Sequence, residues 1–201
     1  MSTAIASLTP LDGTVALTFD DGPSPTDTPK VLAILKKYNV KATFFVMGYA
    51  AKKHPELIKQ ILAEGHTLGL HSMSHPDLTK STDTELQFEV VEPKNILKSI
   101  IGKDAVCVRP PYGAIDERVA EYIESQKMAP IMLGLNSFDF ERLPAKKIAA
   151  WVIKKIQPGM MVLMHDGASD RDQTVVALPL IIEGIQRKGI GFSAICQFGN
   201  G

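Results

Sequence analysis

The sequence lacks any long hydrophobic run and any excess of charge of one sign. No stretch of its 201 residues approaches the roughly 20 apolar residues that a membrane-spanning helix needs, so we predict no membrane span. Lysine and arginine number 22, as do aspartate and glutamate, and the formal net charge is zero. A nucleic-acid-binding domain usually carries a basic surplus, so we predict no nucleic-acid partner.

Cysteine is scarce as well. Cys107 and Cys196 are the only two, and each lies in an apolar run that resembles a buried strand. This setting favours buried free thiols, which is our prediction, although one bridge is compatible with the sequence. Residues 1–10 have neither the basic segment nor the apolar segment of a signal peptide. We expect no export signal here, which fits a protein that stays where it is made or one whose signal has been removed.

The remaining composition is that of an ordinary globular protein. Hydrophobic residues make up 45% and charged residues 22%. The length suffices for one domain with a sizeable core and is short for two. With no internal repeat and no linker, we predict that residues 1–201 form a single domain.

Short apolar runs alternate with longer amphipathic segments. Helices are predicted over residues 28–38, 55–65, 82–102, 116–126, 144–156 and 174–188. The third has Thr82 and Glu85 at the spacing of a capping box, and Pro93 inside it is expected to kink it. Seven apolar runs indicate strands buried on both faces, as in a parallel sheet: Val15–Phe19, Ala42–Met47, Thr67–Leu70, Ala105–Val108, Pro130–Leu135, Met160–Met164 and Gly191–Ile195.

This alternation predicts an α/β fold with about seven parallel strands. A closed or nearly closed barrel and an open doubly wound sheet both fit, and in either the functional groups lie at the carboxyl ends of the strands. Reactive residues do follow the predicted strands, in the order Asp20 and Asp21, His71 and His75, Arg109 and Tyr112, Asp139 and Phe140, His165 and Asp166.

Three of these residues form a candidate metal site. His71 and His75 are four apart, which places both imidazoles on one side if the chain makes a helical turn there. Two histidines and one carboxylate are a common ligand set for a hydrolytic metal, and a neighbouring strand would deliver Asp21 to the same place. A pair of surface histidines has the same spacing, so this pattern alone leaves both interpretations open.

Other residues are candidates for acid–base chemistry. Adjacent carboxylates such as Asp20 and its neighbour are costly to desolvate unless a cation or donor balances them, although a solvated turn is the alternative. Arg109 is suited to orient Asp20, or only to cap carbonyls. His165 is a candidate general acid, or else a satisfied buried histidine. Asp139 or Asp166 could hold its second ring nitrogen.

Taken together, these segments resemble the polysaccharide deacetylase family, also called the NodB homology domain or carbohydrate esterase family 4. All five family motifs are found in order between residues 18 and 166, and this ordered set is far more specific than any single motif. They comprise Thr18–Pro23, then His71, His75 and Pro76, then Arg109, Pro111, Tyr112 and Gly113, then residues 136–140, and finally Leu163, His165 and Asp166.

The resemblance implies a distorted, incomplete (β/α) barrel. It implies a metal-dependent N-deacetylase that releases acetate from N-acetylglucosamine units of a polysaccharide or oligosaccharide of the peptidoglycan or chitin type. One divalent metal is implied, most often zinc, with cobalt as another possibility, bound by Asp21, His71 and His75. The further roles implied are Asp20 as general base, Arg109 as its support, Tyr112 as backbone donor to the oxyanion, His165 as general acid, and Leu163 as a wall of the acetyl pocket.

The fourth motif departs from the family pattern. Asn136 stands where the family usually has an acidic residue, so the support for the pKa of His165 is either reduced or comes from Asp139. Phe140 replaces a tryptophan and keeps an apolar wall for the substrate without the indole N–H.

Three alternatives stay open, of which the second is motivated by these departures. They are a metal amidohydrolase for a small N-acyl substrate, a catalytically weakened glycan-binding domain, and a domain in which the metal is only structural. Because aromatic residues make up only 6% of the chain, we expect a shallow site that engages few sugar units. The sequence does not indicate the oligomeric state.

Overall fold

The computed structural model describes residues 9–197. The prediction that residues 1–10 contain no export signal falls mostly on residues 1–8, which lie outside the described residues. The strands are β1 (Thr14–Asp20), β2 (Thr43–Val46), β3 (Thr67–Leu70), β4 (Cys107–Val108), β5 (Ala129–Pro130), β6 (Leu135–Asn136), β7 (Met161–His165) and β8 (Gly191–Phe192). The helices are α1 (Thr28–Lys37), α2 (Gly48–Lys53), α3 (Pro55–Ala63), α4 (Asp83–Ile101), α5 (Glu117–Ser125), α6 (Ala145–Lys155) and α7 (Asp172–Arg187).

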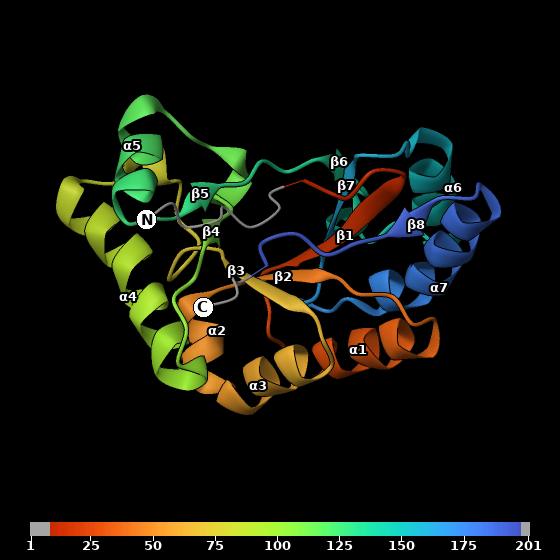
Figure 1. Ribbon diagram of the computed structural model, residues 1–201, viewed down its shortest axis with the longest axis horizontal. Helices are drawn as coiled ribbons and strands as arrows, with labels where there is room; N and C mark the ends of the chain where they lie inside the picture. Colours follow the sequence, from red (N-terminus) through yellow and green to blue (C-terminus); the bar gives the residue numbers. More distant parts are fainter. Residues whose placement is uncertain (1–8, 198–201) are drawn as a thin grey trace.

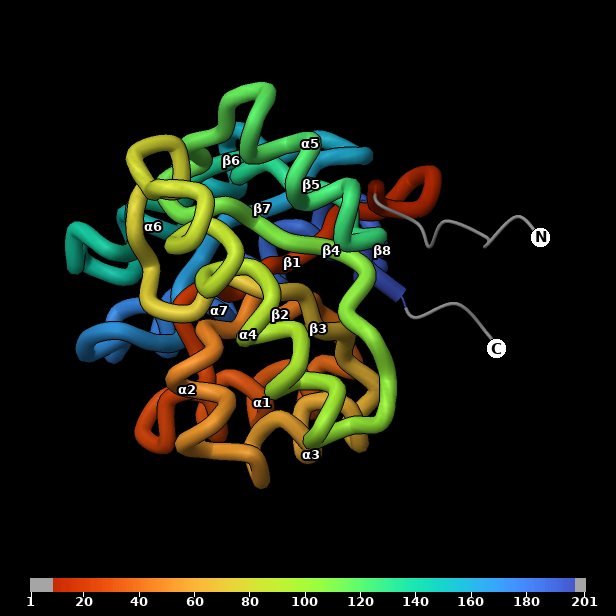
Figure 2. The backbone as a smooth tube through the Cα atoms, turned by 90° about the vertical axis from the view of Figure 1, so that its left-hand side faces the viewer, coloured from red at the N-terminus to blue at the C-terminus, as the bar shows by residue number. Residues whose placement is uncertain are grey.

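In the described part of the chain, the strands form one curved parallel sheet. Its order is β5-β4-β3-β2-β1-β7-β6, and β8 pairs with the first residues of β1. The two end strands, β5 and β6, do not pair with each other, so the barrel stays open between them. Figure 1 shows helices α4, α3, α1, α7 and α6 placed around the outside of the curved sheet, and Figure 2 shows α1, α2 and α3 gathered beneath β2 and β3. The fold is the predicted incomplete (β/α) barrel.

The predicted strand Pro130–Leu135 is wrong as a single element. The chain instead makes two short strands, β5 and β6, at opposite ends of the sheet. Gly134 between them has a φ of 76°, and a Cβ there would lie 2.6 Å from the carbonyl oxygen of Met161. The left-handed turn and this close approach explain why an apolar run breaks where a strand pattern would continue.

The central strand β1 is buried on both faces, as its apolar sequence predicts. Val15, Leu17 and Phe19 join the large core beneath the helices, whereas Ala16 packs in a smaller cluster inside the barrel. Side chains alternate between the two faces of a strand, so Asp20 shares the inner face with Ala16.

The prediction of free thiols is wrong. Cys107 on β4 and Cys196 after β8 form a disulfide, with their Cα atoms 5.9 Å apart. Both side chains are fully buried in the small inner cluster, beside Phe45. The two cysteines are 89 residues apart in sequence, so the sequence alone does not indicate that the fold places them next to each other.

The predicted helices are found, with small changes at their ends. Thr82 and Glu85 form the predicted capping box, and α4 continues through Pro93 to a left-handed Gly102. Helix α7 begins before the predicted Thr174 and runs through Pro179. The short helix α2 was not predicted. Among the described residues, no helix is both long and apolar enough to cross a membrane.

Candidate active site

Polar residues from different strands meet at the carboxyl end of the barrel. Asp20 lies directly opposite His165 in the pairing of β1 with β7, and His71 and Arg109 follow the paired strands β3 and β4. Asp20, His71 and His165 border a cavity of about 380 Å³, whereas Arg109 is fully buried and reaches the site through its contact with Asp20. The cavity is lined by Asp20, Asp21, His71, His75, Tyr112, Leu133, Asn136, Phe140, Leu163, His165 and Arg171. Several of the reactive residues that follow different strands in the sequence thus line a single cavity.

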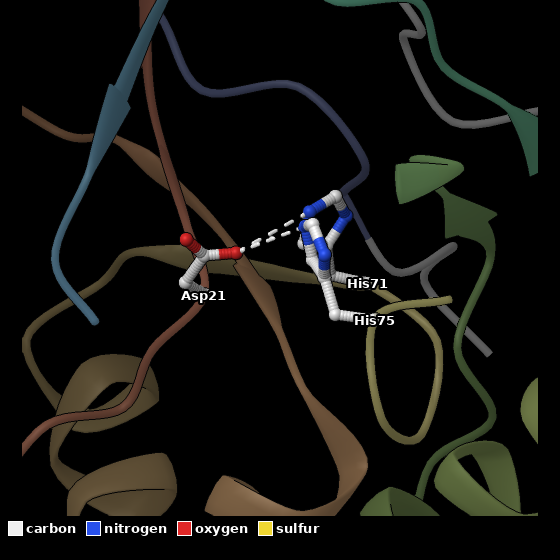
Figure 3. A group of neighbouring side chains, drawn as sticks. All are labelled: Asp21, His71 and His75. Carbon is white, nitrogen blue, oxygen red and sulfur yellow. Dashed lines mark ion pairs between the residues drawn. The ribbon is translucent and has the colours of Figure 1, made fainter. Parts of the chain in front are cut away.

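Asp21, His71 and His75 converge as a possible metal-binding group. Their ligand atoms all lie within 4.8 Å of one another. The Oδ1 atom of Asp21 is 3.5 Å from Nε2 of His71 and 3.4 Å from Nε2 of His75. Figure 3 shows this carboxylate oxygen pointing at both imidazole rings. Two nitrogens and one carboxylate oxygen at such distances suit a divalent ion such as Zn²⁺.

The two histidines meet through a turn and not through the helical turn considered from their spacing. Ser72 and His75 have φ values of 60° and 69°, and the Ser72 hydroxyl accepts a hydrogen bond from the His75 amide at 2.9 Å. Nδ1 of His71 lies 2.7 Å from the carbonyl oxygen of Arg109, which leaves Nε2 free to bind a cation. Burial lowers the pKa of His71, which favours the neutral imidazole that binds metal.

The surroundings of Asp21 also fit a bound cation. Its Oδ1 atom is buried and has no hydrogen-bond partner among the described residues. A buried carboxylate oxygen in this state is costly unless a positive charge faces it. The other oxygen, Oδ2, lies 3.5 Å from a terminal guanidinium nitrogen of Arg171, so the two oxygens have separate surroundings.

Asp20 is held by Arg109 in the interior. Arg109 is fully buried and donates to Asp20 at 2.7 Å and to the Thr18 hydroxyl at 2.8 Å. Its guanidinium carbon lies 4.0 Å from the centre of the Phe45 ring. Gly69 makes room for this layer, because a Cβ there would lie 2.6 Å from the Phe45 ring. Arg109 therefore orients Asp20, and the alternative that it only caps backbone carbonyls is wrong.

His165 is paired with Asp139. Nδ1 of His165 lies 2.8 Å from Oδ1 of Asp139, and the His165 amide donates to Oδ2 at 2.8 Å. Burial by itself would lower the pKa of His165, but Asp139, with smaller contributions from Asp20 and Asp21, outweighs burial and raises it. Burial opposes ionisation of Asp139, yet its bonds to His165 and Thr174 keep the pKa of this carboxyl below its ordinary value.

Asp166, the other candidate partner of His165, has a different place. It is fully buried and accepts a hydrogen bond from the Thr28 hydroxyl at 2.5 Å. Burial, with the charges of Asp21 and Asp20, raises the pKa of Asp166 to about 7. The geometry therefore selects Asp139 as the residue that orients His165.

The predicted substrate-contacting residues border the same cavity. Leu163 is buried in its wall, whereas Tyr112 and Phe140 are exposed at its rim. Tyr112 has a φ of 60°, and its ring meets the edge of His75 with the centroids 4.6 Å apart. A left-handed conformation is unusual for a bulky residue, and such conformations gather at functional sites.

Three residues at the site were not singled out from the sequence. Arg171 lies beside Asp21, while Thr174 and Ser137 donate to Asp139 at 2.8 and 3.0 Å. Arg171 and Thr174 come from the start of α7, directly after β7. The only signal in the sequence is their position after a reactive strand end.

Comparisons with known proteins show which family this chain resembles. A family model described as polysaccharide deacetylase matches residues 8–131. A peptidoglycan-N-acetylglucosamine deacetylase of Bacillus cereus is 34% identical over 185 residues, 91% of this chain and 86% of the relative. A chitooligosaccharide deacetylase of Bradyrhizobium is 37% identical over 195 residues, 91% of this chain and 89% of the relative.

Among solved structures, a crystal structure of a peptidoglycan N-acetylglucosamine deacetylase superposes with a TM-score of 0.89 at 34% identity. The match covers 92% of this chain and 88% of that one. The family model covers more than half of the chain, and these relatives match along most of their length. The chain therefore belongs to the polysaccharide deacetylase family.

Proposed function

We propose that this protein is a metal-dependent N-deacetylase that releases acetate from N-acetylglucosamine units of a glycan. The observation that carries the proposal is the arrangement within one cavity. Three metal-binding side chains lie beside a carboxylate held by an arginine and an imidazole whose pKa is raised. Relatives named as peptidoglycan and chitooligosaccharide deacetylases support the glycan substrate.

In this proposal Asp21, His71 and His75 hold one divalent ion, of which zinc best suits the ligand set. A bound divalent ion supplies Lewis-acid polarisation of the amide carbonyl and lowers the pKa of a bound water molecule. Arg171 fixes the second oxygen of Asp21, so that a single oxygen faces the two histidines.

Asp20 acts as the general base. Arg109 and the buried surroundings fix its carboxylate, whose Oδ2 lies 3.7 Å from Nε2 of His71 and therefore next to the metal-binding group. The carboxylate takes a proton from the attacking water as the new carbon–oxygen bond forms. The backbone N–H of Tyr112 donates to the oxygen that gains negative charge, an interaction typically worth about 3 kcal/mol in such sites.

His165 acts as the general acid. Asp139 holds Nδ1, so the proton on Nε2 is free to pass to the amide nitrogen while the carbon–nitrogen bond breaks. The products are acetate and a free amine on the sugar. Leu163 and Phe140, which line the cavity, provide apolar contacts to the acetyl group and the sugar ring.

The proposal is tested by measuring acetate release from N-acetylglucosamine oligomers and from peptidoglycan. We expect wild-type protein to release acetate and Asp20→Asn to lose at least about a thousandfold in rate, because the substituted residue cannot accept a proton. The matched control is Asp104→Asn, a surface aspartate that pairs with Lys98. Release from small N-acyl amides alone would instead favour the small-substrate amidohydrolase.

A further inference from the structure

A second pocket lies directly beside the active-site cavity. Its volume is about 340 Å³, and its lining is mainly apolar but includes two charged side chains. The residues that matter here are Phe138, Leu143, Ile148 and Trp151, with Glu141 and Lys147. Nothing in the mechanism above uses this pocket.

One short segment forms a wall of both spaces. Asn136 and Phe140 line the active-site cavity, whereas Ser137, Phe138 and Glu141 line the second pocket. The two spaces are therefore separated by a single segment of chain that follows β6. A glycan chain that extends from the cavity across this segment would therefore lie over the second pocket.

Aromatic rings connect the two spaces. The Phe140 ring lies 5.8 Å from the ring of His165 and 6.2 Å from that of Phe138, and Phe138 in turn lies 5.8 Å from Trp151, all between centroids. Phe140 is 46% exposed and Trp151 is 38% exposed. The row begins at the proposed general acid and ends in the second pocket. We name Phe140, Phe138 and Trp151 the aromatic row.

Asn136 holds two members of the aromatic row, Phe138 and Trp151. Its carbonyl oxygen accepts a hydrogen bond from Trp151 Nε1 at 2.9 Å, and its side-chain oxygen accepts one from the Phe138 amide at 2.8 Å. Phe138 has a φ of 59°, a conformation that is unfavourable for a bulky residue and persists only when its surroundings impose it. Rings held so firmly lose little freedom when a ligand packs against them.

We propose that the aromatic row and the second pocket form a binding subsite for a further sugar ring of the substrate glycan, an inference that rests on the proposed function. A pyranose ring presents a face of C–H groups that packs against aromatic rings, while its hydroxyls need polar partners at the edge. Glu141 and Lys147 provide such partners. The site thereby extends beyond the few sugar units expected from the low aromatic content.

Steady-state kinetics on the disaccharide and the pentasaccharide of N-acetylglucosamine test the subsite. We expect Trp151→Ala to raise KM for the pentasaccharide about tenfold, the loss of about 1.4 kcal/mol of binding, with kcat and the KM of the disaccharide unchanged. Phe138→Asn, which tolerates the left-handed conformation, should act in the same way if the first variant folds poorly. Phe88→Ala is the control, because it removes an exposed ring from α4. It should leave kcat and KM unchanged for both substrates.

Trp151 is the sole tryptophan, so its fluorescence reports on this subsite directly. In the metal-loaded Asp20→Asn protein, we expect the pentasaccharide to change the emission and the monosaccharide to leave it unchanged. Pentasaccharide binding by calorimetry without a change in emission, or an equal effect of Trp151→Ala on short and long substrates, would overturn the subsite and leave the deacetylase proposal standing. Absence of acetate release from every glycan would instead overturn the proposed function.

Discussion

Arg109 is an unusual residue because a fully buried guanidinium faces only one carboxylate. Its Nη1 atom serves Asp20 and Thr18, while Nε and Nη2 have no hydrogen-bond partner among the described residues and the group packs on Phe45. The charge of Arg109 and that of Asp20 therefore depend on each other. Removing one partner of such a pair leaves an uncompensated buried charge.

We predict that Arg109→Met lowers the free energy of unfolding by about 3–5 kcal/mol, because Asp20 is left buried without its cation. Urea unfolding of the single variants, Asp20→Asn included, and of the double variant measures the coupling. The double variant should lose less than the sum of the single losses. Simple additivity would show that the pair is not coupled.

Asp139 raises the pKa of His165, which leads to a prediction on pH dependence. The general acid must be protonated, so activity falls as pH rises through the pKa of His165. Asp139→Asn removes the main favourable partner and lowers that pKa. The alkaline limb of the kcat/KM profile should therefore move to lower pH. If Asp139→Asn lowered kcat/KM by the same factor at every pH and left the alkaline limb at the same pH, this role of Asp139 would be contradicted.

Residues with distinctive spacing were predictable, and residues without it were not. The structure brings the predicted Asp21, His71 and His75 together, because ordered motifs at strand ends carry position as well as chemistry. Arg171 and Thr174 gave no such signal, since an arginine and a threonine near a helix start are commonplace.

At the scale of elements, α4 shows how local sequence determines structure. Thr82 accepts from the Glu85 amide, and the Glu85 carboxylate accepts from the Thr82 amide at 2.8 Å. The same pattern was legible in the sequence because a capping box needs residues only three positions apart. The division of one apolar run into β5 and β6 could not be predicted from the sequence, since it depends on the close approach of Gly134 to Met161 of β7.

We predict that Thr82→Ala lowers the free energy of unfolding by about 1 kcal/mol, because the Glu85 amide at the start of α4 loses its side-chain acceptor. Ser99→Ala is the matched control, since this exposed hydroxyl only donates to the Ile96 carbonyl within the same helix. Chemical denaturation compares the two variants. Equal effects would show that the cap contributes nothing specific. Acetate release should be unchanged in both.

At the scale of the molecule, the disulfide joins β4 to the segment after β8 across the barrel interior. The bridge closes a loop of 89 residues in sequence, so it restricts the unfolded chain strongly. Sequence inspection favoured free thiols because burial is visible in an apolar run, whereas pairing depends on how the barrel folds. Local periodicity predicted the alternation of strands and helices, but this alternation fits an open sheet as well as a barrel. The incomplete barrel was implied by the family resemblance.

We predict that replacing both Cys107 and Cys196 by alanine lowers the free energy of unfolding by about 2–4 kcal/mol. Reducing agent should lower the Tm of the wild-type protein and leave that of the double variant unchanged. An identical response of both proteins to the reducing agent would show that the bridge does not form in solution.

The central claim is that Asp21, His71 and His75 hold a metal on which deacetylation depends. The most direct measurement is acetate release from N-acetylglucosamine pentasaccharide by protein that has been stripped of metal and then titrated with zinc. We predict no release from stripped protein and full recovery at one equivalent of zinc, with no recovery in His71→Ala. Undiminished release from the stripped protein, or full recovery in His71→Ala, would contradict this claim.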